Sequence, residues 1–167
     1  MRKGAPLKTK IFIEDSYGPS FINKLILKLK EIKLVKKEIE ITCDKFEINR
    51  LERLIKAQIV RNSRIIVIID CDGNCDAGNA KHIIKTCLSN KVTERSIIKL
   101  KYEIEEWICT IKKMDYGREK PSKVLKHKIG YEKYRLPDYA SYIAENYQEL
   151  MNESESFNQF IGCLKSL

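Results

Sequence analysis

Residues 64–72 read RIIVIIDCD, and this stretch decides the fold of the 167-residue chain. Five consecutive β-branched residues favour a strand, and the absence of polar alternation is typical of a strand covered on both faces. Such strands lie at the centre of parallel sheets flanked by helices. The run therefore predicts an α/β fold in which this strand ends on Asp70.

On both sides of this strand the chain alternates between strand and helix patterns. Three more strands are predicted at residues 10–14, 38–42 and 96–102, with helices between them at 19–32, 48–59 and 77–89. Pro19 suits the first helical turn, and Asp44 with Glu47 forms a capping pattern before the second helix. The alternation predicts a mainly parallel, four-stranded, Rossmann-like sheet with helices on both faces.

The rest of the chain carries helical patterns. Residues 103–113 place Trp107 and three isoleucines at helical spacing, Pro121 begins a short basic helix, and residues 137–150 and 153–164 complete the chain. We expect Trp107 to lie in the core. A length of 167 residues is typical of one domain, so residues 1–167 are predicted to form a single unit.

The formal charge of +9 is unevenly distributed along the chain. Residues 24–37 and 112–135 are rich in lysine and arginine, whereas residues 137–167 carry five acids and one lysine. Clustered cations favour a polyanionic partner, since phosphate contacts by Lys and Arg release counterions. A solvated lysine-rich surface explains the same charge about as well.

Six cysteines are scattered along the chain without the spacing of a disulfide framework. This pattern predicts mostly buried thiols in a reducing compartment, and hence a cytoplasmic protein. The longest aliphatic run, Ile65 to Ile69, is far shorter than the roughly 20 residues of a membrane helix. We therefore expect no membrane association.

Acidic residues stand where two predicted strands end. Glu14 closes the first strand, and Asp70 and Asp72 follow the central one. Side chains alternate along an extended strand, so Asp70 and Asp72 are expected on the same side. Mg²⁺ prefers such oxygen ligands together with a substrate phosphate, and Mn²⁺ is the alternative ion. The alternative interpretation is that these acids cap the following helix or shape a turn.

Several other kinds of site are excluded or weakly supported. The stretch after Asp70 resembles the start of a calcium loop, but Cys75 and Lys81 stand where that loop requires Gly and Glu. Cys71, Cys75 and His82 lack the second ligand pair of a structural zinc site. Neither a P-loop nor a dinucleotide-binding motif is present, and serine-hydrolase motifs are missing.

Together these patterns resemble a known family. Ile11-Phe12-Ile13-Glu14 before a helix, followed by the central strand and Asp70-x-Asp72, is similar to the Toprim domain of topoisomerases, bacterial-type primases, OLD-family nucleases and small stand-alone proteins. The resemblance implies a core at about residues 9–102 and a C-terminal helical extension over the remainder. It also implies that Glu14 is a general acid or base and that Asp70 and Asp72 hold Mg²⁺.

The chain departs from this family after the first strand, where Asp15 stands in place of the usual glycine. No tyrosine-nucleophile domain is visible, so topoisomerase activity by this chain alone is not expected. Glu103 is a further candidate metal ligand, and Glu105 or Glu106 are others. For Glu105 and Glu106, a position in the first turn of a helix, where acids interact favourably with the helix dipole, is a slightly better explanation than metal binding.

The predicted function is Mg²⁺-dependent cleavage or phosphoryl transfer on a nucleic acid, with DNA and RNA equally open. The alternative is a non-catalytic DNA- or RNA-binding module, or a subunit of a nucleic-acid-processing complex. In either case a basic stretch with interleaved tyrosines is the candidate phosphate-binding surface. Its members are Lys112, Lys113, Arg118, Lys120, Lys123, Lys126 and Lys128.

Overall fold

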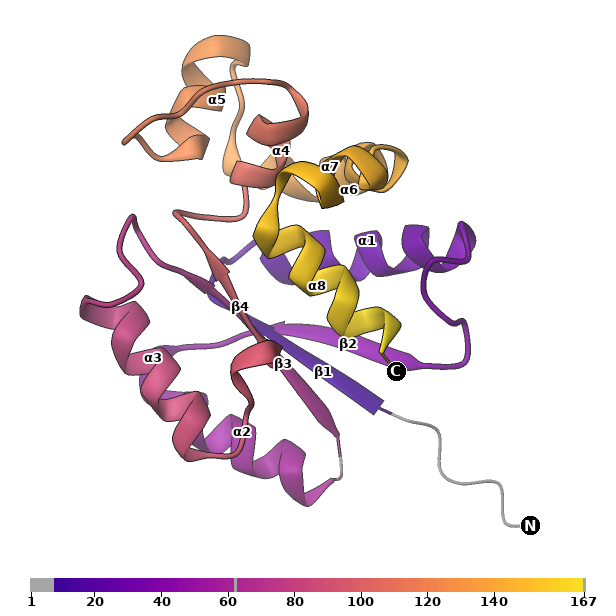
Figure 1. Ribbon diagram of the computed structural model, residues 1–167, viewed down its shortest axis with the longest axis vertical. Coiled ribbons are helices and arrows are strands. Elements are labelled where there is room, and N and C mark those ends of the chain that lie inside the picture. The colour runs from indigo at the N-terminus through magenta and orange to yellow at the C-terminus, as the bar shows by residue number, and fades with distance from the viewer. Residues whose placement is uncertain (1–7, 62, 167) are drawn as a thin grey trace.

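A single parallel sheet organises the computed structural model, which describes residues 8–61 and 63–166 (Figure 1). Its strands are β1 (Lys8–Ile13), β2 (Glu40–Lys45), β3 (Arg64–Asp70) and β4 (Ile97–Leu100). The strand order is β2-β1-β3-β4, and all three neighbouring pairs are parallel. The predicted α/β class with a four-stranded parallel sheet is confirmed.

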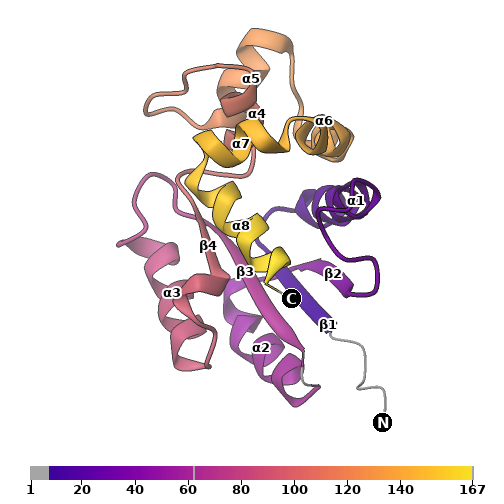
Figure 2. The same ribbon diagram turned by 45° about the vertical axis from the view of Figure 1, so that its right-hand side comes forward.

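Helices cover both faces of this sheet (Figure 2). One face is covered by α1 (Gly18–Glu31) and α8 (Glu155–Lys165), and the other by α2 (Leu51–Val60) and α3 (Gly78–Ser89). The alternating side chains of β3 supply both cores: Ile66 and Ile68 face the first pair of helices, and Val67 and Ile69 face the second. Burial on both faces explains the unbroken aliphatic run.

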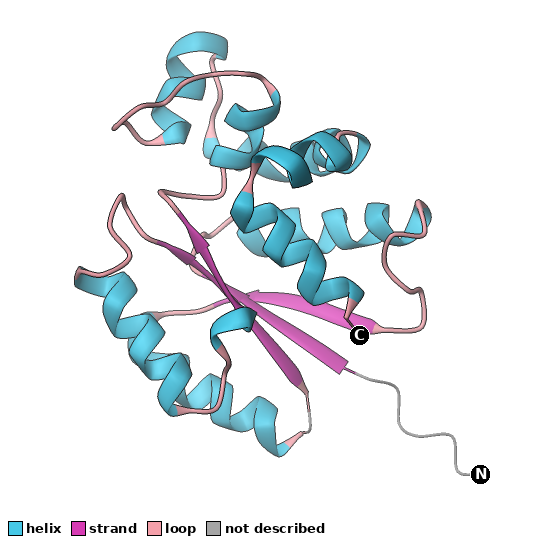
Figure 3. Cartoon of the chain, viewed as in Figure 1, coloured by secondary structure: helices cyan, strands magenta, loops and turns pink. Residues whose placement is uncertain are grey.

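The remaining helices gather beyond the carboxyl ends of the strands and beside α1 (Figure 3). They are α4 (Glu106–Ile111), α5 (Pro121–Ile129), α6 (Ala140–Glu145) and α7 (Tyr147–Glu153), with a 3₁₀ segment η3 (Lys133–Tyr139) before α6. Trp107 on α4 is fully buried against Phe157 and Phe160 of α8, as predicted. Its indole N–H donates to Ser156 Oγ at 2.9 Å.

Some predicted boundaries are wrong. β2 lies two to three residues later than the predicted 38–42, so Asp44 belongs to the strand and pairs with Lys10 instead of capping a helix. The helix predicted over 137–150 is divided among η3, α6 and α7, with Pro137 inside the 3₁₀ segment. The limits of β2 are set by its parallel pairing with β1, which local patterns do not report.

None of the helices in the described part of the chain is both long enough and apolar enough to span a membrane.

The turn after β1 depends on close packing at Gly18. A Cβ atom at this position would lie 2.8 Å from Ile13 Cδ1 and 3.0 Å from Ile13 Cγ2. Ile13 is itself fully buried, so it has little room to move. The absence of a side chain therefore allows α1 to begin directly against the end of β1.

We expect Gly18→Ala to destabilise the protein by about 1–3 kcal/mol, because an added methyl group overpacks the core. Gly162→Ala is the matched control, because nothing lies within 4 Å of its Cβ position and α8 is helical there. That variant should be neutral or more stable by up to about 1 kcal/mol. Urea denaturation measures both, and equal stabilities would contradict the packing role of Gly18.

Candidate functional site: an acidic crevice

The strand order places a topological switch point between the carboxyl ends of β1 and β3; we call the acids that gather there, Glu14, Asp15, Asp70, Glu103 and Glu105, the acidic crevice. After β1 the chain continues into α1 on one face of the sheet, whereas after β3 it continues into α3 on the other (Figure 1). The two connections therefore separate at neighbouring strands, which are paired from Thr9 and Arg64 to Ile13 and Ile68. Open α/β sheets bind ligands at such switch points.

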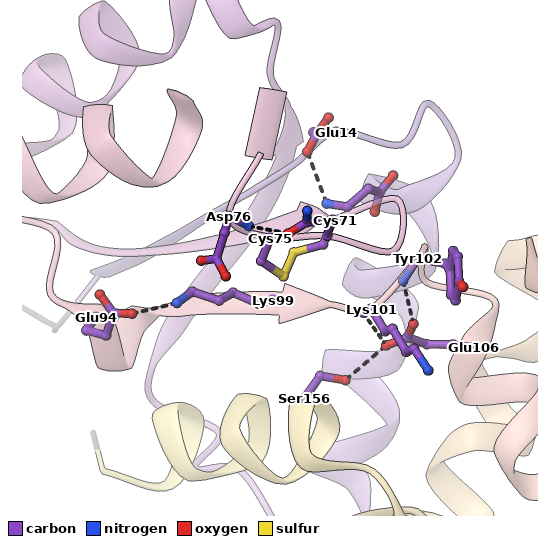
Figure 4. The surroundings of a disulfide bond; sticks show 12 residues. Glu14, Cys71, Cys75, Asp76, Glu94, Lys99, Lys101, Tyr102, Glu106 and Ser156 are labelled. Atoms are coloured by element: carbon purple, nitrogen blue, oxygen red, sulfur yellow. Dashed lines mark hydrogen bonds and ion pairs between the residues drawn. A yellow bond between two sulfur atoms is a disulfide. The ribbon is translucent and has the colours of Figure 1, made fainter. Parts of the chain in front are cut away.

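Glu14 and Asp70 meet in this crevice. The Glu14 carboxylate accepts a hydrogen bond from the Asp70 backbone N–H at 3.0 Å (Figure 4). Burial raises the pKa of Glu14, the hydrogen bond from Asp70 opposes this, and the negative charge of Asp72 raises it further. Glu14 and Asp70 are thus in direct contact, through the backbone amide of Asp70 and the side chain of Glu14.

Asp70 is the most perturbed acid of the crevice. Burial raises its pKa to about 8, and the negative charges of Glu14, Asp15, Glu103 and Glu105 add to this effect. Its Oδ1 atom is buried without a hydrogen-bond partner among the described residues. A buried carboxylate oxygen without a partner is costly, and such an atom at a ligand-binding edge is a natural contact for a cation.

The side chain of Asp72 does not lie on the same side as that of Asp70, contrary to the prediction. β3 ends at Asp70, and Asp72 has a left-handed backbone (φ 48°), so the alternation of an extended strand no longer applies. Its exposed carboxylate forms an ion pair with Lys120 of the α5 N-cap at 3.4 Å. Asp72 is still near enough to affect Glu14 electrostatically, so it lies at the rim of the crevice.

Asp15, which replaces the glycine usual in the resembled family, forms the turn by a different route. Its Oδ1 atom accepts hydrogen bonds from the backbone N–H groups of Tyr17 at 2.7 Å and Gly18 at 3.1 Å. Its Oδ2 atom forms an ion pair with Lys133 at 3.3 Å. The side chain thus shapes the start of α1 and contributes a charge to the crevice, a role that the sequence patterns did not indicate.

Glu103 lies beside the crevice but is already bound on both oxygens. Its Oε1 atom accepts from the Ser122 backbone N–H at 2.8 Å, and its Oε2 atom pairs with Lys133 at 3.2 Å. Burial alone would raise its pKa, but the hydrogen bonds from Ser122 and Lys133 outweigh that effect and lower it. Glu103 therefore connects the loop after β4 to α5. We predicted Glu103 as a metal ligand, but both of its oxygens are already bound within the protein.

We explained Glu105 from the sequence mainly by the helix dipole, but it belongs to the acidic crevice. It is completely buried, its Oε1 atom accepts from the Tyr131 hydroxyl at 3.0 Å, and Lys133 lies 3.6 Å from the same oxygen. Its Oε2 atom has no partner within the described residues. Burial raises its pKa to about 7, and the charge of Glu103 adds to this. Glu105 therefore contributes to the crevice and does more than favour a helix dipole.

Glu106 has a structural role. Its carboxylate accepts hydrogen bonds from the backbone N–H groups of Lys101 at 3.1 Å and Tyr102 at 3.0 Å, and from the Ser156 hydroxyl at 3.4 Å. The first two bonds close the turn between β4 and α4, and the third joins α4 to α8, as Figure 4 shows. Glu106 is thus turned away from the candidate site.

Lys133 supplies the main positive charge of the crevice. Its ammonium group contacts Asp15, Glu103 and Glu105, which come from two different loops. Burial opposes the charged form of Lys133, but the three carboxylates outweigh it and raise the pKa above its usual value. Lys133 lies 118 residues from Asp15 in the sequence, so no local pattern indicated this contact.

The predicted basic surface is divided by the fold. Lys112 lies over the rings of Tyr139 and Tyr142, and Lys113 forms ion pairs with Glu149 and Glu153 of α7. The C-terminal part of the chain therefore already supplies interaction partners for both of these cations. The other predicted cations are exposed on α5 or in the loop before it, and α5 adjoins the crevice through Lys120. They are Arg118, Lys120, Lys123, Lys126 and Lys128.

The cysteines agree with the prediction in four cases. Cys43, Cys87, Cys109 and Cys163 are buried free thiols, whereas Cys71 and Cys75 form a disulfide across the loop that carries Asp72. The sequence supported a zinc site only weakly, and these two sulfur atoms cannot bind zinc while they form a disulfide.

The described side chains contain no group of three or more His, Cys, Asp or Glu residues arranged to hold a metal ion. Comparison of the chain with family models, curated proteins and solved structures finds no match.

We expect Asp70→Asn to stabilise the protein in the presence of a chelator. The folded chain retains a proton on Asp70 up to about pH 8, whereas an ordinary aspartate loses it near 3.8, so wild-type stability falls as pH rises through this interval. The variant lacks this penalty. Its advantage should be about 1–3 kcal/mol at pH 8 and small at pH 4.

Thermal unfolding in EDTA at several pH values measures this effect. The exposed Asp76→Asn variant is the control and should follow wild type throughout. A lower stability of Asp70→Asn at pH 8 would contradict the cost assigned to the buried carboxylate.

Replacing Lys133 by Met should destabilise the protein by about 2 kcal/mol at pH 7, because it leaves three carboxylates without their shared cation. The loss should shrink at pH 5, where Glu105, with a pKa of about 7, takes up a proton. Urea denaturation at both pH values tests this, with Lys123→Met on the exposed face of α5 as control. Equal losses in the two variants would show that Lys133 is an ordinary surface lysine.

Proposed function

We propose that the crevice binds Mg²⁺ or Mn²⁺ and that the protein cleaves or transfers a phosphodiester of a nucleic acid, as a small Toprim-type enzyme. The observation that carries the proposal is the Asp70 carboxylate, which lies beside Glu14 at the switch point and whose Oδ1 atom is buried without a partner among the described residues. A protein that gains nothing from this arrangement would be more stable without it.

The donor set suits a hard cation. Asp70 offers an unpartnered oxygen, Glu14 uses one oxygen for the Asp70 amide, and Asp72 lies at the rim. We assign Asp70 and Asp72 as the ligands, with Asp72 leaving Lys120 to join Asp70. When bound, the ion would neutralise the charge of a phosphoryl group and of its leaving oxygen.

Glu14 is suited to proton transfer in the proposed reaction. Burial and the nearby Asp72 raise its pKa, which brings a carboxylic acid closer to neutral pH, where general acids and bases are most effective. The backbone N–H of Asp70 fixes one of its oxygens at 3.0 Å and thereby orients the side chain. We infer that Glu14 activates the attacking group or protonates the leaving oxygen.

The substrate class follows from the charge around the crevice. The N-terminal end of α5 reaches it through the ion pair of Lys120 with Asp72, and Lys123, Lys126 and Lys128 continue along the same exposed helix. A phosphate chain following α5 would lead toward Asp70. We therefore propose DNA or RNA as the substrate. We also propose a cytoplasmic location, because four of the six cysteines are buried free thiols.

The proposal is tested by metal titration and by cleavage of labelled single- and double-stranded DNA and RNA. Mn²⁺ binding by isothermal titration calorimetry should be saturable, and cleavage should require the ion. Asp70→Asn and Glu14→Gln should each lower the cleavage rate by about a hundredfold or more. Only Asp70→Asn should also remove cation binding.

Asp76→Asn is the control, since this exposed acid lies in the same loop outside the crevice. Cleavage that survives in Asp70→Asn would overturn the enzyme proposal.

A second candidate function is non-catalytic nucleic-acid binding. It is favoured by Lys133, whose ammonium group already neutralises three acids, and by the lack of a preformed three-ligand group among the described residues. In that case affinity should fall steeply with salt, and Asp70→Asn should leave it unchanged. Filter binding at two salt concentrations distinguishes this candidate from the enzyme.

A further inference from the structure

The disulfide lies next to the candidate site. Cys71 and Cys75 close a short ring of backbone that contains Asp72, and Figure 4 shows it beside β4 with Lys99 and Lys101 nearby. Within this ring Asp72 and Gly73 both have positive φ, at 48° and 91°. The disulfide thus holds a tightly turned segment whose one carboxylate faces Lys120.

The two sulfur atoms differ in their access to solvent. Cys71 is 4% exposed, whereas Cys75 is half-buried and lines a groove of about 370 Å³. An attacking thiolate must reach the sulfur that it displaces, so access favours reaction at Cys75. The four remaining cysteines are buried free thiols and offer no comparable site.

The groove has charges of both signs. Lys99 and Lys101 line it together with Glu94 and Glu155, and Lys99 forms an ion pair with Glu94 at 2.5 Å. A volume near 370 Å³ falls within the range of small-molecule sites. Ammonium groups attract carboxylates and carboxylates attract amines, so the groove is matched to a small thiol that carries both groups.

We propose that the Cys71–Cys75 disulfide is a reversible thiol-exchange site, opened at Cys75 by a small zwitterionic thiol, and that opening releases the turn that holds Asp72. The exchange site stands by itself. Its effect on cation binding rests on the proposed function, because it assumes that Asp72 is a ligand.

The exchange proceeds in two balanced steps. A thiolate of the small thiol attacks Cys75 Sγ, the bond to Cys71 breaks, and Cys71 Sγ leaves as a thiolate that takes a proton from solvent. A second thiolate then attacks the mixed disulfide at the sulfur of the small thiol. Cys75 leaves as a thiolate and is protonated, and two small thiols have been oxidised to one disulfide.

Opening removes the covalent restraint on Asp72. The turn is then held by the Gly73 N–H, which donates to the Lys101 carbonyl at 2.7 Å, and by the Asn74 N–H, which donates to the Cys71 carbonyl at 2.9 Å. A left-handed backbone is unfavourable for a residue other than glycine, although aspartate tolerates it better than most. The open loop therefore allows Asp72 to leave this conformation and turn toward Asp70.

Mass spectrometry of the native protein tests the exchange site. Purified without reductant, the chain should contain four free thiols, and reduced glutathione should form its first adduct at Cys75. The quantity compared is the ratio of the reaction rate with glutathione to the rate with uncharged 2-mercaptoethanol. This ratio should be about tenfold higher for the protein than for a disulfide-bonded peptide of residues 69–77. The Lys101→Gln/Glu155→Gln variant should abolish this preference, and Lys85→Gln, outside the groove, should keep it.

Six free thiols in the native protein, or a first adduct at another cysteine, would overturn the proposal. So would a glutathione preference equal to that of the peptide.

Two measurements test the consequence for Asp72. Amide hydrogen exchange at Gly73 and Asn74 should be at least about tenfold faster after reduction and in Cys75→Ser, and unchanged rates would overturn release of the turn. Mn²⁺ should bind about tenfold more tightly to these open forms than to the disulfide form. Equal, measurable affinities would overturn the link to Asp72.

If none of the forms binds Mn²⁺ while thiol exchange and amide exchange behave as expected, the proposed function fails and the thiol-exchange site stands.

Discussion

Electrostatic repulsion among buried acids at the ends of the strands is the constraint on which this end of the molecule depends. Asp70 is influenced by four other carboxylates, and burial makes each of these charges harder to maintain. Lys133 relieves the repulsion by contacting three of the acids, and it comes from η3, beyond α5. The C-terminal extension is therefore part of the crevice, because its folding back brings the required cation.

Lys133 does not remove the whole cost. Asp70 Oδ1 and Glu105 Oε2 remain buried without partners among the described residues, and the pKa values of both groups lie well above those of ordinary carboxylates. Apolar residues at these positions would pack without such a penalty. Stability alone therefore does not account for the acids, and this is the reason for our proposal that a cation binds at this edge of the sheet.

The sequence predicted features that depend on local patterns. The aliphatic run of β3 gave its limits, Arg64–Asp70, and the position of Glu14 and Asp70 at the same edge of the sheet followed from parallel alternation, whereas the pairing of β1 with β3 did not. Features set by long-range pairing were not predictable in this way. The shift of β2 follows its pairing with β1, and Lys133 meets Asp15 only in the folded chain.

The prediction for Asp72 failed for a different reason. Alternation of side chains assumes an extended backbone, but the backbone is left-handed at Asp72 (φ 48°), just after β3 ends. A spacing of two residues therefore says nothing about direction once a strand has ended. The disulfide was missed similarly, because a separation of four residues is compatible with many loop conformations.

The two loops of the crevice are consequently unequal. After β1, the Asp15 side chain holds two backbone N–H groups and Gly18 packs closely on Ile13, so Glu14 stands on a fixed turn. After β3, a disulfide and two backbone hydrogen bonds hold Asp72 away from Asp70. In the proposed function, a site that joins a fixed acid to a movable one would gain its full ligand set only when the second loop yields, and the chemistry of that loop would then set when a cation is bound.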